Sequence, residues 1–269
     1  MKTFGKLFTF LVYLFLYAPL LVMIIFSFNE AASTSVFTGF SLHWYGELLN
    51  KRQIGEALQN TLILASLSSI TATLIGTLAA LGIYHMKKKA VVKAYMTVTN
   101  IPMMNPDIIT GVSLMLLFVF VGKTLGMQDS LGFGTLLIAH ITFNIPYVIL
   151  NVLPKLRQTD PHLLEAALDL GCTPVKAFIK VVLPAISSGI VSGLIMAFTL
   201  SLDDFVISYY TTGSDFQTLP TLIYSITKKP VKPYIYALFS IIFFVILLML
   251  VLMNVMQAKS DRKNARKNS

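Results

Sequence analysis

Three carboxylates lie within or at the end of otherwise apolar stretches, where charged side chains are costly and by default mark a functional path. Asp107 lies near the middle of one stretch, and Asp203 and Asp204 lie toward the end of another, two residues after Ser201. These stretches contain no Lys or Arg that could pair with the acids. We therefore expect the three carboxylates to attract a cation. Protonated carboxylates, or pairing with a partner chain, are the structural alternatives.

A cation with well-separated charges would suit well-separated carboxylates. Polyamines have this form, because their amines are linked by apolar methylene groups. Trp44, Tyr209 and Tyr210 could add aromatic faces for a cation near the outer mouth of a path. The same aromatic residues are also typical of the belt at a membrane interface, and the sequence leaves the two interpretations open.

Composition indicates the elements that must hold these residues. Hydrophobic residues make up 55% of the 269 residues and charged residues 12%, about half the charged share of a soluble domain. A soluble globular fold and a disordered chain are both excluded. Six apolar stretches are long enough to cross a bilayer, which predicts an all-α polytopic membrane protein with a single domain over 1–269. The six spans cover about residues 7–29, 60–85, 97–122, 131–153, 184–212 and 234–257.

Two details qualify these spans. The first has an apolar core longer than the 7–15 residues of a signal peptide, so we expect a retained transmembrane helix. The third contains Pro102 and Pro106 beside Asp107. Because proline removes a helical hydrogen bond, unwound backbone is predicted here, and at membrane depth such backbone must line protein or a cavity.

Basic residues set the orientation. With both termini in the cytoplasm, 15 of the 21 Lys and Arg residues lie inside, as the positive-inside rule requires. The net charge of +9 is therefore interpreted as a topology anchor beside anionic lipid and not as a nucleic-acid site. The lone cysteine, Cys172, excludes a disulfide within the chain.

The segment 155–184 is the longest predicted cytoplasmic piece. Asp160, followed by proline, starts a short helix over 162–170, and Gly171 ends it in the left-handed conformation. A second short helix is expected over 175–182, separate from the following span. Two helices this short cannot cross a bilayer, so they would form a compact surface loop or a docking element for a soluble partner.

The same segment resembles the EAA loop of ABC-importer permeases, with valine at position 181 where the family has isoleucine or a similar residue. The resemblance implies a type I (MetI-like) permease fold and a loop that inserts into a cytoplasmic ATPase. The implied coupling residues are Glu165, Ala166, Ala167, Gly171, Leu183 and Pro184. The chain has no GxxxxGK[ST] phosphate loop. We therefore expect it to be no enzyme and to carry no cofactor, with ATP and Mg bound by two copies of the partner ATPase.

A narrower resemblance covers nearly the whole chain in order. Phe40–Leu48, Asn105–Asp107, His140–Pro146, Glu165–Gly171 and Phe198–Phe205 are similar to the C-type subunit of the spermidine/putrescine permease family. This implies a bacterial inner-membrane protein that pairs with a second permease chain and receives polyamine from an extracytoplasmic binding protein. The residues it implicates in uptake are Trp44, Asp107, Glu165, Ser201, Asp203 and Asp204.

Three rival functions follow from the same residues. The scaffold could import another small cationic or metal-containing substrate. A membrane-embedded enzyme would need convergent polar residues, and the four histidines, His43, His85, His140 and His162, are scattered and interpreted as structural or interfacial. An uncoupled channel or secondary carrier would have no need of an ATPase-docking segment.

Overall fold

The computed structural model describes residues 2–31, 36–228, 232–245, 247–248 and 251. This part of the chain is helical, with an isolated bridge between Asn29 and Phe40, and confirms the all-α fold class. In chain order the helices are α1 (Lys2–Ser27), α2 (His43–Leu49), α3 (Arg52–His85), α4 (Lys89–Met104), α5 (Asp107–Thr124), α6 (Phe133–Gln158), α7 (His162–Asp169), α8 (Pro174–Ala177), the π-helical turn η1 (Phe178–Val182), α9 (Leu183–Asp203), α10 (Val206–Thr211) and α11 (Leu219–Thr227).

Several helices have the length and composition to cross a membrane. Five candidate spans cover Gly5–Ser27, Arg52–His85, Asp107–Thr124, Phe133–Gln158 and Pro174–Asp203. A shorter apolar helix covers Pro233–Val245, and most of the remainder of the predicted span 234–257 lies outside the described residues. The chain is thus a multi-pass membrane protein.

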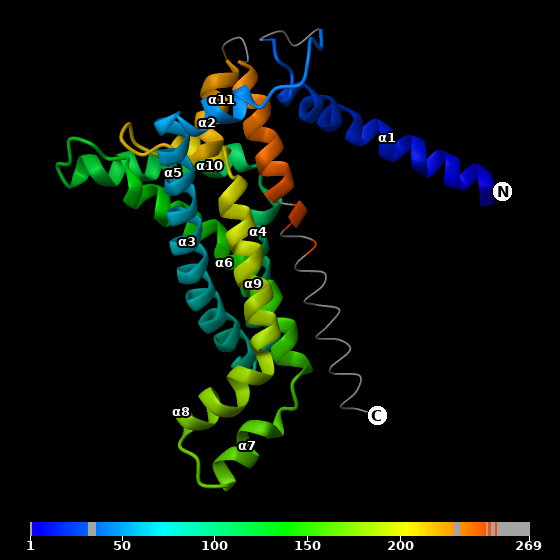
Figure 1. Ribbon diagram of the computed structural model, residues 1–269. Coiled ribbons are helices and arrows are strands. Elements are labelled where there is room, and N and C mark those ends of the chain that lie inside the picture. Colours follow the sequence, from blue (N-terminus) through cyan, green and yellow to red (C-terminus); the bar gives the residue numbers. More distant parts are fainter. Residues whose placement is uncertain (1, 32–35, 229–231, 246, 249–250, 252–269) are drawn as a thin grey trace. The chain divides into compact units, whose positions relative to one another are not determined.

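By its internal contacts the chain divides into two compact units, residues 1–55 with 226–269 and residues 56–225, where composition predicts a single domain. The second unit holds three of the predicted carboxylates and the whole 155–184 segment. Within it, α6 packs along α9, and α3 contacts both of them. Helices α7 and α8 project beyond one end of this bundle (Figure 1). Helix α10 packs on α5 and α6.

Close backbone approach holds the bundle together. Lipid is as apolar as a leucine side chain, so helices in a membrane associate by tight packing of small residues and not by the hydrophobic effect. Gly189 and Gly193 form a GxxxG pattern on α9. A Cβ at Gly189 would lie 2.9 Å from the carbonyl oxygen of Asn151, and one at Gly193 would lie 3.3 Å from Cα of Val148, both on α6. Val148 also contacts α3, because a Cβ built at Gly76 would lie 2.7 Å from the Cβ of Val148.

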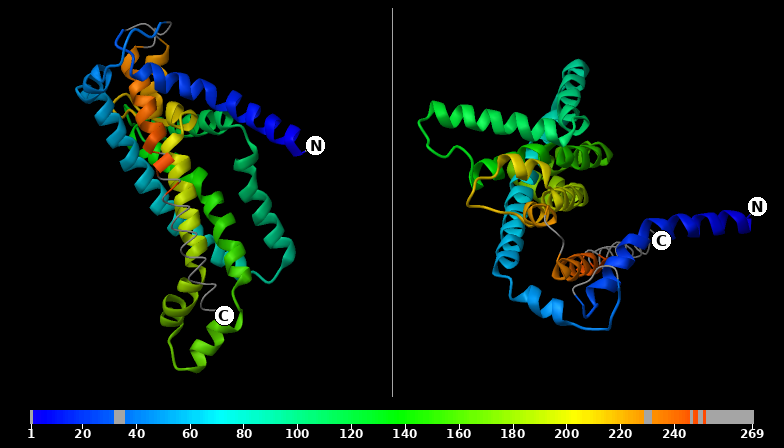
Figure 2. Two further views of the ribbon diagram at one scale, coloured as in Figure 1. Left: turned by 45° about the vertical axis from the view of Figure 1, so that its right-hand side comes forward. Right: turned by 90° about the horizontal axis from the view of Figure 1, so that it is seen from above.

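The predicted third span, 97–122, is not one helix. Helix α4 ends at Met104 and α5 starts at Asp107, and Figure 2 shows that the two meet at an angle. The ring nitrogen of Pro106 cannot donate to α4, and Asn105 is already extended, with ψ of 141°. The predicted break is confirmed, but Asp107 is the first residue of a new helix and not the middle of a span.

The predicted separation between the second short helix and the fifth span is also wrong. Helical structure runs without interruption from Pro174 to Asp203. At η1 the N–H of Leu183 donates to the carbonyl of Phe178, five residues back, so the hydrogen-bond ladder widens just before Pro184. A π-helical turn of this kind lets the helix continue past a residue that has no N–H.

The predicted fifth span, 184–212, breaks before its end. Helix α9 stops at Asp203, Asp204 is extended with ψ of 122°, and α10 begins at Val206. The sequence places no proline or glycine here, so the break must be stabilised by side chains.

The Gly76 contact gives a test of the packing. Gly76→Ala should lower the free energy of unfolding by about 1–3 kcal/mol, because its Cβ would overlap the buried, branched Val148. The matched control is Gly82→Ala on the same helix, where no atom lies within 4 Å of the new Cβ. Thermal unfolding of the purified protein in detergent measures both. Equal melting temperatures for Gly76→Ala and the unchanged protein would contradict this packing.

Candidate functional site

The break between α9 and α10 is the centre of a buried polar cluster. Its members come from four helices of the second unit. They are Ser68 of α3, His140 and Asn144 of α6, Ser201 of α9, Asp204 at the break and Ser208 of α10. Each is at most 9% exposed. In a membrane such groups must satisfy one another.

Asp204 caps the restarted helix. Its Oδ2 accepts a hydrogen bond from the backbone N–H of Ser208 at 2.7 Å, and its Oδ1 accepts one from the N–H of Ile207 at 3.2 Å. These donors belong to the first turn of α10, where no preceding helical carbonyl is available. Nε2 of His140 lies 3.4 Å from Oδ2 and 3.0 Å from the hydroxyl of Ser208. The carboxylate is therefore held by α6 as well as by α10.

A second set of contacts fixes the end of α9. The amide nitrogen of Asn144 donates to the hydroxyl of Ser201 at 2.7 Å, and the hydroxyls of Ser201 and Ser68 lie 2.9 Å apart. His140 and Asn144 stand one turn apart on α6 and so share a face. That face therefore anchors the chain just before and just after Asp203.

Two atoms of this cluster have no hydrogen-bond partner in the described structure. They are Nδ1 of His140 and Oδ1 of Asn144, both buried. Unpartnered buried polar atoms are uncommon and costly. Both lie on the α6 face that holds the break.

The other two carboxylates predicted to attract a cation, Asp107 and Asp203, have exposed side chains. Helix α5, which starts at Asp107, packs on α10, and a Cβ at Gly111 would lie 3.5 Å from the carbonyl oxygen of Val206. The second turn of α5 therefore lies against the first turn of α10. An acidic residue at each start also opposes the positive end of a helix dipole, a structural role that competes with cation binding.

Aromatic residues cluster on α10. Tyr209 is 47% exposed, and its ring centroid lies 5.5 Å from that of Phe205 and 5.3 Å from that of Tyr210. Tyr224 of α11 joins the group, 4.3 Å from Phe205. The contact of Tyr209 with a cation stays a prediction.

Trp44 belongs to the other unit. Its indole N–H donates to the carbonyl oxygen of Asn29 at 2.6 Å, and the hydroxyls of Tyr45 and Ser27 lie 2.7 Å apart. These bonds fix α2 to the end of α1. The contact of Trp44 with a substrate stays a prediction.

The 155–184 segment has the predicted start and turn. Oδ1 of Asp160 accepts a hydrogen bond from the N–H of His162 at 2.9 Å, which caps α7, although α6 extends to Gln158 and shortens the loop. Gly171 has a φ of +82°, the left-handed conformation expected of it. No atom lies within 4 Å of a Cβ built there, so glycine is required by backbone conformation and not by space.

Glu165 lies on the exposed face of α7. Its carboxylate is 74% exposed and lies 3.1 Å from Nδ1 of His162. The hydrogen bond that His162 donates to Glu165, with the negative charges of Glu165 and Asp160, raises the pKa of His162 above its ordinary value. The charged pair is complete below that ordinary value and is lost as the pH rises through the raised pKa of His162. Ala166 lies beside Glu165 on the same helix, while Ala167 is buried.

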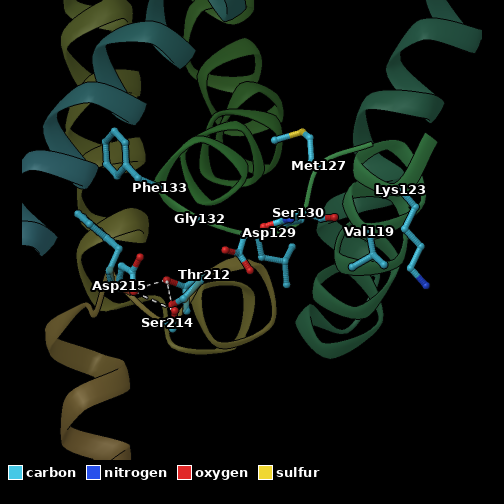
Figure 3. Close-up of a pocket in the computed structure, with 14 residues that line it drawn as sticks. Val119, Lys123, Met127, Asp129, Ser130, Gly132, Phe133, Thr212, Ser214 and Asp215 are labelled. Atoms are coloured by element: carbon cyan, nitrogen blue, oxygen red, sulfur yellow. Dashed lines mark hydrogen bonds between the residues drawn. The ribbon is translucent and has the colours of Figure 1, made fainter. Parts of the chain in front are cut away.

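A cleft of about 720 Å³ opens elsewhere in the second unit. It lies between the α5–α6 connection and the α10–α11 connection (Figure 3). Asp129 and Asp215 line it, with Lys123 at its edge. The residues that line the cleft do not include Asp107, Asp203 or Asp204, so this cleft and the buried polar cluster are different places.

Sequence reasoning missed part of the cluster. His140 is interpreted from the sequence as structural, and Asn144, Ser68 and Ser208 are not singled out. One signal was available, because His140 and Asn144 are polar residues spaced i, i+4 within an apolar helix. Such a pair predicts a polar stripe that faces protein and not lipid.

The comparisons with known proteins agree with this architecture. The model of the family described as "Binding-protein-dependent transport system inner membrane component" matches residues 72–266. The chain is 39% identical over 228 residues to the putrescine transport system permease protein PotI of Escherichia coli (strain K12), covering 85% of this chain and 81% of that protein. It is 37% identical over 232 residues to the spermidine/putrescine permease protein PotC of the same strain, covering 86% and 85%.

A solved structure shows the same fold. It is the bacterial alginate ABC transporter in complex with alginate pentasaccharide-bound periplasmic protein. One of its chains aligns with a TM-score of 0.72 at 18% identity, covering 94% of this chain and 92% of that chain. At this identity the similarity concerns the fold alone.

Proposed function

The chain belongs to the family of binding-protein-dependent transport system inner membrane components, and on this premise we propose that it forms half of a polyamine path through an ATP-driven importer. The observation that carries the proposal is its similarity, over most of its length, to putrescine and spermidine/putrescine permeases. Their names give the substrate class for which the carboxylates at the helix breaks are suited.

The chemistry of the breaks supports a cation. Asp107 and Asp203 are exposed at two interruptions of helices, and irregular backbone at membrane depth is tolerated where it is buried in protein or lines a water-filled cavity. A polyamine presents ammonium groups joined by methylene chains, so separated carboxylates and the exposed ring of Tyr209 match it in charge and in apolar surface. Ser201 and Asp204 contribute through the buried cluster at the break.

The remaining parts of the importer are partner chains. A second permease subunit would complete the path, two copies of a cytoplasmic ATPase would bind ATP and Mg, and an extracytoplasmic binding protein would deliver the polyamine. The solved alginate transporter was captured with a periplasmic protein, which supports an assembly of this kind. The distribution of Lys and Arg favours cytoplasmic termini in a bacterial inner membrane.

The 155–184 segment would couple ATP hydrolysis by the ATPase to transport through the permease. Glu165, Ala166 and Ala167 on α7 would enter the ATPase surface, and Gly171 would provide the turn that presents them. Leu183 and Pro184 continue directly from the segment into α9. As the ATPases close on ATP, the paired segments would approach each other and the path would open outward.

Uptake of radiolabelled spermidine and putrescine tests the substrate. The transporter, assembled with its partner chains in proteoliposomes, should import polyamine when ATP is present inside. Asp107→Asn should lower the uptake rate about tenfold, equivalent to about 1.4 kcal/mol, because the path loses a negative charge. The control is Asp129→Asn, an exposed acid away from the breaks. If the unchanged transporter imports no polyamine, the scaffold serves another small cationic or metal-containing substrate.

A substitution at Gly171 tests coupling. Gly171→Val should reduce uptake per ATP hydrolysed while the complex still assembles, because a branched residue in the left-handed conformation costs about 1–2 kcal/mol and would redirect α7. Gly171→Asn is the matched control, since asparagine tolerates this conformation. ATPase activity and uptake are measured on the same proteoliposomes. Normal coupling in Gly171→Val would contradict the role given to this turn.

A further inference from the structure

The two adjacent acids at the α9–α10 break have different surroundings. Both oxygens of Asp204 accept backbone hydrogen bonds from α10, and its side chain is only 9% exposed. Asp203 is exposed. We propose that Asp203 alone contacts the substrate cation, and that His140 and Asp204 form a positioning pair that holds Asp203 in place. This inference rests on the proposed polyamine transport and assigns different roles to two neighbouring carboxylates.

The hydrogen bonds of Asp204 explain why it does not bind the cation. In the described structure its Oδ2 receives the N–H of Ser208 and faces Nε2 of His140 at 3.4 Å, and its Oδ1 receives the N–H of Ile207. An ammonium group that took the place of His140 beside Oδ2 would leave a fully buried imidazole without this partner, which is costly.

The contribution of His140 follows from its tautomer. Only Nε2 faces the carboxylate and the hydroxyl of Ser208, so Nε2 must carry the hydrogen to stabilise the carboxylate. A buried carboxylate whose donor partner is removed is strongly destabilised. His140 therefore fixes the position of Asp204, and through it the start of α10, without contact with the substrate.

The chain just before Asp203, at the end of α9, is also held by hydrogen bonds. Ser201 bonds to Asn144 at 2.7 Å and lies 2.9 Å from the hydroxyl of Ser68. Asp203 thus stands between two anchors, both attached to one face of α6. A carboxylate presented by rigid neighbours meets its ligand with little loss of conformational freedom, which is the physical advantage of preorganisation.

The two acids should respond differently to conservative substitutions. At position 203 the charge matters, so Asp203→Glu should keep uptake within about threefold of the unchanged transporter and Asp203→Asn should lower it about tenfold or more. At position 204 the cap matters. Both oxygens of Asp204 accept N–H groups of α10, whereas asparagine has one acceptor oxygen and glutamate is absent from the preferred capping residues. Asp204→Asn and Asp204→Glu should therefore each lower uptake and the melting temperature of the assembled transporter together.

The positioning role of His140 has its own comparison. His140→Gln keeps an N–H donor on a side chain that can reach Asp204, whereas His140→Leu removes the donor. Spermidine uptake should be largely retained in His140→Gln and should fall about tenfold in His140→Leu. Asp203→Asn should leave the melting temperature of the assembled transporter unchanged, whereas His140→Leu and Asp204→Glu should lower it.

All variants are assayed as the complete transporter in proteoliposomes, with equal amounts of assembled complex. The proposal is overturned if Asp204→Asn loses uptake while its melting temperature stays that of the unchanged transporter, because Asp204 would then act through its charge and not through its hydrogen bonds. It is also overturned if His140→Leu melts and transports like the unchanged protein. If the unchanged transporter imports no polyamine, the proposed function fails, and the melting temperatures alone decide the positioning pair. If Asp204→Asn is too unstable to assemble, the comparison of His140→Gln with His140→Leu decides the positioning pair.

Discussion

A backbone that breaks inside a membrane-spanning bundle must find new partners for its polar groups, and the carboxylate of Asp204 supplies them at the α9–α10 break. It receives two N–H groups of α10 that water would satisfy in a soluble protein. A buried carboxylate in turn requires a donor, which His140 provides. The end of α9 is held by the bonds of Ser201 to Asn144 and Ser68. These dependencies explain why a bundle packed through glycine and aliphatic side chains keeps a polar cluster in its interior.

The sequence predicts the parts that depend on local chemistry. The all-α class, the break near Pro106 and the left-handed conformation of Gly171 each follow from a short run of residues, and the structure confirms them. What the sequence does not predict depends on distant partners. The helix continues through Pro184 because the π-helical turn before it widens the hydrogen-bond ladder, and α9 stops at Asp203 without proline or glycine because side chains from α6 and α3 stabilise the break.

The link between the proposed ATPase-docking segment and the path is a single long helix. The run Pro174–Asp203 contains 30 residues and is about 45 Å long at 1.5 Å per residue. One end adjoins the turn at Gly171, and the other carries Asp203. Movement of the 155–184 segment would therefore be transmitted along α9 to Asp203, the residue proposed to bind the substrate. The π-helical turn η1 is the place where the helix could bend. Figure 2 shows the same continuous course from α8 into α9.

The most direct test of this account is an experimental structure of the assembled transporter with spermidine held in the path. The account predicts an ammonium nitrogen within about 3–4 Å of the Asp203 carboxylate, the range of an ion pair. Asp204 should still accept the N–H groups of Ile207 and Ser208 and should still face His140. Density for an ammonium group on Asp204, with His140 displaced from it, would contradict the central claim that Asp204 positions Asp203 and does not itself bind the substrate.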